Sequence, residues 1–144
     1  MMRFIVLVFV VSSPCVLSQD AGKKTDSDRL QGAWAPVSVE SGGEREMGDE
    51  LLLVVKGKRM QVRVRDADPQ ATTWGEFKVD ETKTPKRLDT TLPTQIGRLG
   101  IYRLNGDELV ICAVAGRAAE TRPQQFKTEP GDGRIITVWR RRAS

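Results

Sequence analysis

The stretch LQGAWAPVSVE, residues 30–40, has the alternation of a β-strand. Val37 and Val39 alternate with polar residues, so one face of the strand is apolar and the other is polar. Pro36 has no amide hydrogen to donate to a neighbouring strand, so we expect a bulge or a partly unpaired edge there. The stretch therefore predicts the first strand of a β-rich protein.

Strand patterns of this kind recur along the 144-residue chain, and no segment shows sustained helical periodicity. Tight turns are predicted at KGK (56–58), NGD (105–107) and GDG (131–133). The other predicted strands are 51–56, 59–65, 74–80, 86–91, 99–104, 108–114 and 134–140, with 122–128 as a candidate for one more. Eight or nine short strands with hairpin links predict an all-β fold, either a closed antiparallel barrel or a sandwich.

Two neighbouring predicted strands differ in their expected burial. Residues 51–56 (LLLVVK) are continuously apolar, which predicts burial on both sides. Residues 59–65 alternate instead, with an apolar face of Met60, Val62 and Val64 and a polar face of Arg59, Gln61, Arg63 and Arg65. We interpret the basic face as a solvated surface that deters edge pairing, since no aromatic residues are interleaved with the arginines as a nucleic-acid site would favour.

The N-terminus has the three parts of a secretory signal peptide. Arg3 precedes an apolar run at 4–11, and Val16 and Ser18 are small residues at positions −3 and −1 of a cut after Ser18. The run is too short to span a membrane. We therefore predict export to the periplasm or the extracellular space, with lipid anchoring at Cys15 as a minor alternative.

The predicted organisation is a signal peptide at 1–18, a flexible polar leader at 19–28 and one barrel domain at 29–142. Within the leader, Ser27 or Asp28 is expected to cap a single helical turn that runs to Leu30.

Several chemistries are missing from the sequence. It contains no histidine, and Cys112 is the single cysteine left after signal cleavage, in an apolar segment that predicts a buried thiol. Phosphate-binding glycine loops and the Gly-x-Ser-x-Gly motif are also missing. We therefore predict no metal, no cofactor and no enzymatic activity; catalysis by carboxylates alone is the lowest-ranked reading.

The chain resembles a family of small exported domains abundant in planctomycete bacteria. The resemblance covers most of 28–142, and the motifs that carry it are Gly32-x-Trp34, Pro85-Lys86-x-x-Asp89, Gly100-Ile101-Tyr102, Gly106-Asp107-x-Leu109, Cys112, Arg122-Pro123 and Phe126. The family has no established biochemical activity to carry over. The resemblance implies a lipocalin-like antiparallel barrel.

In lipocalin-like barrels, a Gly-x-Trp at the start of the first strand lets the chain cross the closed end of the barrel. Here Gly32 would permit the close backbone approach and Trp34 would plug that end. An arginine of the last strand stacks on the indole in such barrels, and we expect Arg140 or Arg142 to supply it.

Two functions follow as hypotheses. The first is binding of a small apolar ligand inside the barrel, with candidate contacts at Trp34, Phe77, Tyr102, Arg122 and Phe126. The second is a protein-interaction or inhibitor module of the cell envelope, acting through its surface, its loops or an N-terminal arm at 19–28. Nucleic acid is not an expected partner, and the sequence does not indicate an oligomeric state.

Overall fold

The computed structural model describes residues 24–48, 50–64, 66–68, 74–91, 99–114 and 121–143. Their elements are α1 (Asp26–Arg29), β1 (Gly32–Ser41), β2 (Glu44–Met47), β3 (Leu51–Lys56), β4 (Arg59–Val64), β5 (Gly75–Asp80), β6 (Lys86–Thr90), β7 (Leu99–Asn105), β8 (Glu108–Val114) and β9 (Arg134–Arg141). The predicted signal peptide, Cys15, the first part of the leader and Arg65 lie outside the described residues.

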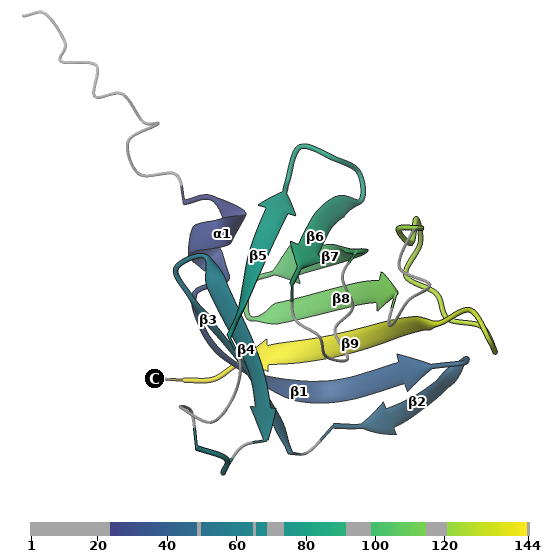
Figure 1. Ribbon diagram of the computed structural model, residues 1–144, viewed down its shortest axis with the longest axis horizontal. Coiled ribbons are helices and arrows are strands. Elements are labelled where there is room, and N and C mark those ends of the chain that lie inside the picture. The colour runs from purple at the N-terminus through teal and green to yellow at the C-terminus, as the bar shows by residue number, and fades with distance from the viewer. Residues whose placement is uncertain are drawn as a thin grey trace, which may run out of the picture.

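Eight of these strands close into an antiparallel barrel (Figure 1). The strands from β3 to β9 each pair with the next along the chain, and β9 returns to pair with β1. β1 also pairs with β3 near its start and with β2 near its end, so β2 is an extra strand beside the ring. The predicted antiparallel barrel of eight to nine strands, preceded by a short helical turn, is confirmed.

The two ends of the barrel are built differently. α1, the start of β1 and the β3–β4, β5–β6 and β7–β8 turns lie at one end, which we call the α1 end. The β1–β2 turn and the last residues of β4, β6 and β8 lie at the other end, which we call the mouth.

The predicted irregularity near Pro36 is a bulge in β1. Pro36 is opposite Trp139 and Ser38 is opposite Val138, so Val37 is an additional residue with no partner in β9. An additional residue reverses which side chains face inward along the rest of a strand. Trp34 thus faces the interior before the bulge, and Val39 does so after it.

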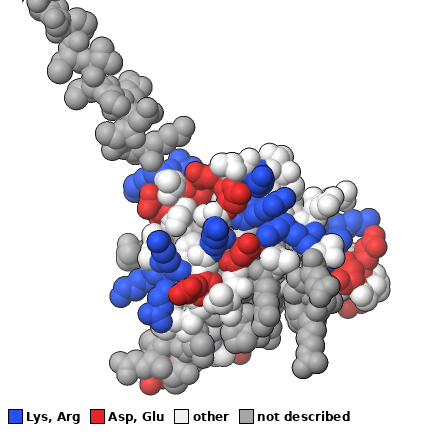
Figure 2. Space-filling model, turned by 45° about the horizontal axis from the view of Figure 1, so that its top comes forward, with Lys and Arg blue, Asp and Glu red and all other residues white. Residues whose placement is uncertain are grey.

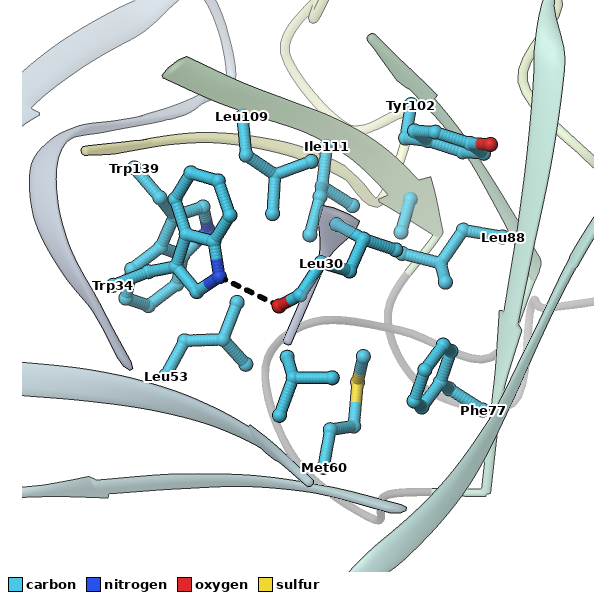
Figure 3. Close-up of a cluster of buried hydrophobic side chains, with 12 residues drawn as sticks. Leu30, Trp34, Leu53, Met60, Phe77, Leu88, Tyr102, Leu109, Ile111 and Trp139 are labelled. Atoms are coloured by element: carbon cyan, nitrogen blue, oxygen red, sulfur yellow. Dashed lines mark hydrogen bonds between the residues drawn. The ribbon is translucent and has the colours of Figure 1, made fainter. Parts of the chain in front are cut away.

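The barrel interior is packed around Leu30, which follows α1 and lies in the middle of the cluster with Trp34 on one side and Leu88 on the other (Figure 3). Trp34 is 0% exposed, and its Nε1 donates to the Leu30 carbonyl oxygen over 2.9 Å. Large apolar side chains buried to this degree each stabilise the fold by about 1.5–3 kcal/mol. The other buried members are Leu53, Val55, Met60, Phe77, Tyr102, Leu109, Ile111, Ala113 and Trp139.

A smaller apolar cluster lies outside the barrel. Ile101, Val110, Cys112 and Ile136 form it on the outer face of β7, β8 and β9, and Phe126 packs against it. Residues 122–128 therefore cover the barrel as an irregular segment and are not the additional strand that we predicted. Cys112 is buried as predicted, and burial raises the pKa of its thiol.

Three local predictions were wrong. The cap of α1 is Thr25, whose side chain accepts from the Asp28 amide, and not Ser27 or Asp28. The end of the leader is accordingly a capped turn with a buried Asp26, not a flexible segment. On the polar face of β4, Gln61 is only 1% exposed, so that face is not simply solvated.

Candidate binding cavity

α1 is fastened to the barrel by a buried carboxylate. Asp26 is 3% exposed, and its Oδ2 accepts from Lys86 Nζ over 2.7 Å and from the Tyr102 hydroxyl over 2.7 Å. The Asp26 amide donates to Glu81 Oε2 over 3.0 Å, which links the helix to the turn between β5 and β6. Two strands and one turn therefore hold the first turn of α1.

The electrostatics of this group keep Asp26 ionised. Burial by itself would raise the pKa of the Asp26 carboxyl, but the hydrogen bonds from Lys86 and Tyr102 and the charge of Lys86 outweigh it, so the pKa lies below its ordinary value. Burial, and then the bond to Asp26, raise the pKa of the Tyr102 phenol. The ionised Asp26 therefore forms a partly buried ion pair with Lys86 that joins α1 to the barrel.

Arg141 covers Trp34 at the α1 end. Its guanidinium carbon lies 4.2 Å from the centroid of the indole, and its nitrogens donate to the carbonyl oxygens of Gln31 and Arg29. Nε also lies 3.3 Å from Asp107 Oδ1. One side chain thus joins the last strand to the chain segment that crosses the barrel end.

Our prediction that Arg140 or Arg142 stacks on Trp34 was wrong. Side chains of a strand alternate between the two faces of the sheet, and Trp139 points into the core. Arg141 shares the face of Trp139, whereas Arg140 lies on the other face and is exposed. Alternation along the strand, counted from an inward-facing Trp139, would have selected Arg141.

Gly32 lies where the chain turns from α1 into β1. Its φ is +119°, a value that residues with a side chain rarely adopt, and a Cβ there would lie 3.5 Å from Arg141 Nη1. Gly32 is thus placed where the resemblance implied, at the start of the strand beneath the arginine.

The mouth half of the barrel interior contains an apolar cavity of about 270 Å³. We call it the mouth cavity. Its walls come from the second half of β1, from the first residue of β3, and from β4 and β9. Its lining residues are Val39, Ser41, Leu51, Val62, Ile135, Thr137 and Trp139. Val39 and Ser41 line it because the bulge turns them inward.

A hollow of about 520 Å³ lies at the α1 end and is a poorer candidate. Charged side chains line much of it, among them Lys24, Asp28, Arg29 and Asp107. Its central cation, Arg141, is already bound to Asp107, to two carbonyl oxygens and to the Trp34 ring. A ligand there would compete with contacts that close the barrel.

None of the five residues predicted to contact a ligand lines the mouth cavity. Trp34, Phe77 and Tyr102 are brought together, but in the packed cluster around Leu30. Arg122 and Phe126 lie outside the barrel, where Arg122 Nη1 is 2.6 Å from Asp89 Oδ1 and donates to the Gly100 carbonyl oxygen, and Phe126 packs under Arg103. Among the described residues, the lining of the mouth cavity is mainly aliphatic, and Trp139 is its one aromatic side chain.

The outer surface carries both signs of charge. Figure 2 shows Lys and Arg side chains interspersed with Asp and Glu over the face toward α1. Opposite charges also lie opposite each other across neighbouring strands, as with Lys78 and Asp89. Arg59 does have an aromatic neighbour, which the sequence pattern did not indicate: its guanidinium carbon lies 5.5 Å from the centroid of the Trp74 ring. The mixture of charges nonetheless differs from the basic stripe of a nucleic-acid site.

Comparisons with protein-family models, curated proteins and solved structures found no match. In the part of the chain that the structure describes, no helix has the length and apolar character needed to cross a membrane.

Proposed function

We propose that this protein is an exported, non-enzymatic barrel that binds one small apolar molecule in the mouth cavity. The observation that carries the proposal is an apolar cavity of about 270 Å³ inside a barrel whose other end is filled by side chains. Concave, mostly apolar sites with few polar groups are typical of small-molecule binding. Export rests on residues 1–18, and the resemblance to exported planctomycete domains agrees with it.

Native mass spectrometry of the protein purified from its own source tests the proposal. We expect a retained small molecule, and we expect Val62→Phe to lose it because the larger side chain fills the cavity. Val37→Phe is the matched control, since Val37 is in the bulge and 36% exposed. Retention of the same molecule by Val62→Phe, or its loss from both variants alike, would contradict binding in this cavity.

The second candidate is an interaction module of the cell envelope. It is favoured by exposed apolar side chains on the outer face of β1 and β2, where Met47 is 75% exposed and lies opposite Ser38, next to Val37. Affinity purification from envelope extracts tests it, with Met47→Ser plus Val37→Ser as the comparison. A partner that is retained equally by this double variant would not bind through that surface.

A further inference from the structure

One polar group in the mouth cavity is both buried and incompletely hydrogen bonded. Thr137 on β9 is 6% exposed and lines the cavity. Its hydroxyl oxygen accepts from Trp139 Nε1 over 2.8 Å, so the indole sets the position of the oxygen. Among the residues that the structure describes, the hydroxyl donates to no acceptor.

The bond from Trp139 leaves the Thr137 hydrogen free for another group. A hydroxyl that accepts a hydrogen bond turns its own hydrogen away from the donor, and here that hydrogen has the cavity beside it. Buried donors without an acceptor are rare in proteins because leaving one unpaired is unfavourable. Water can satisfy such a group in a free cavity, and a ligand that displaces the water must supply an acceptor in its place.

The remaining lining limits the charge of the ligand. Val39, Leu51, Val62 and Ile135 are aliphatic, Ser41 is at the exposed end of β1, and none of the described residues that line the cavity is charged. Moving an ion from water into such a cavity without a counter-charge is strongly unfavourable. The described lining therefore disfavours both carboxylates and ammonium groups.

We infer that the mouth cavity selects neutral, apolar molecules with a single hydrogen-bond acceptor, such as a carbonyl oxygen, that receives the hydrogen of Thr137. This inference rests on the proposed function and adds the class of ligand to it. A volume of about 270 Å³ is at the lower end of ligand sites, so the ligand has the size of one substituted ring.

Three probes of nearly the same shape test the inference. Acetophenone has a carbonyl acceptor, α-methylstyrene replaces that oxygen by a methylene group, and benzoate is an anion at pH 7. Each is titrated by ligand-observed NMR into the full mature protein, into Thr137→Val and into Thr137→Ser. Valine keeps the shape of threonine without the hydroxyl, and serine keeps the hydroxyl.

We expect the wild-type protein to bind acetophenone about fivefold more tightly than α-methylstyrene, as one net hydrogen bond implies. The Thr137→Ser variant keeps this preference, Thr137→Val loses it, and benzoate does not bind. Because the two neutral probes are compared within the same protein, a general destabilisation by Thr137→Val does not imitate the result.

The outcomes that overturn the inference separate it from the proposed function. Equal binding of both neutral probes to the wild-type protein overturns the acceptor requirement and leaves the binding function standing. A preference that survives in Thr137→Val overturns the assignment to Thr137. Tight binding of benzoate overturns the exclusion of anions, and binding of none of the probes contradicts the binding function itself.

Discussion

At the scale of single residues, Asp26 connects α1 with the barrel through two strands. Its carboxylate accepts hydrogen bonds from Lys86 and from Tyr102, each over 2.7 Å. The Asp26 side chain is only 4% exposed. Neither partner is near it in sequence. The spacing of Thr25 and Asp28, which form the capping box of α1, was the one local pattern that could have indicated this turn.

Replacement of Asp26 by Asn is expected to lower the free energy of unfolding by about 2 kcal/mol. The estimate lies below the range of about 3–5 kcal/mol for fully buried ion pairs because the Lys86 side chain is 39% exposed and water can solvate it after the change. Denaturant unfolding at pH 7 measures the difference. Asp80→Asn is the control, because Asp80 is bonded only within its own exposed turn.

The same residue predicts a dependence on pH. Because the pKa of Asp26 in the folded protein lies below its value in the unfolded chain, the carboxylate stabilises the fold above the unfolded value, near 3.9, and this contribution is lost as the pH falls through the folded value. The difference in unfolding free energy between wild type and Asp26→Asn should therefore shrink between about pH 5 and pH 2. A difference that stays constant over this range would show that Asp26 acts without its charge.

Arg141 is a second residue whose identity matters. Lysine cannot donate to two carbonyl oxygens and lie flat on the Trp34 ring at once, so Arg141→Lys should lower the free energy of unfolding by about 1.5 kcal/mol. Arg140→Lys, one position earlier on the exposed face, should change it by less than about 0.5 kcal/mol. Equal effects of the two substitutions in denaturant unfolding would contradict the closure role of Arg141.

At the scale of elements, β2 is the strand that sequence analysis missed. Its residues, Glu44 to Met47, are all exposed, so the alternation of apolar and polar residues that predicts a strand is missing. The strand forms because the tight turn after Ser41 returns the chain along β1, where Arg45 lies opposite Glu40 and 3.8 Å from its carboxylate. Turn geometry and pairing thus decide this element, and neither is visible in residues 44–47 alone.

We expect the charges of β2 to disfavour pairing of its outer edge with a second copy. Among the described residues β2 pairs with β1 only. In one register of a twofold-related pair of β2 strands, Arg45 lies opposite Arg45 and Glu44 opposite Glu46. In another, Glu46 lies opposite Glu46. Like charges in such positions are unfavourable.

Removal of these charges should therefore promote association. In sedimentation velocity experiments, Glu44→Thr plus Glu46→Thr should increase the average mass with concentration more than the wild-type protein does. The control is Glu76→Thr plus Glu108→Thr, which removes the same number of negative charges from exposed positions on strands paired on both sides. Association of the control to the same extent would assign the effect to net charge and not to the edge.

The lining of the mouth cavity could not be predicted from the sequence for a related reason. Alternation and turns suffice to find a strand, which is why the barrel could be predicted from the sequence. Which residues line the cavity depends on the bulge at Val37, because it turns Val39 and Ser41 inward. Pro36 indicated the irregularity, but the position of the additional residue is set by pairing with β9, more than 90 residues away in the chain.

At the scale of the whole molecule, the barrel is not equally strong around its circumference. Within the described residues, β7 and β8 are in register from Leu99↔Val114 to Asn105↔Glu108, whereas β4 and β5 share only Arg59↔Glu76 and Met60↔Gly75, with one further bond from the Phe77 amide to the Lys58 carbonyl oxygen. We call the β4–β5 contact the seam. Val62 of β4 lines the mouth cavity, so the seam adjoins the proposed binding site.

The barrel is therefore expected to open first at the seam. In native-state hydrogen exchange, the amides of Met60 and Phe77 should exchange at least tenfold faster than those of Ile111 in β8, which is paired on both sides by long ladders. Bound acetophenone should slow exchange at the seam more than in β8, because the ligand contacts Val62 and stabilises only the closed barrel. Exchange that begins in β8, or a seam as protected as β8, would show that the short ladder does not limit the stability of the barrel.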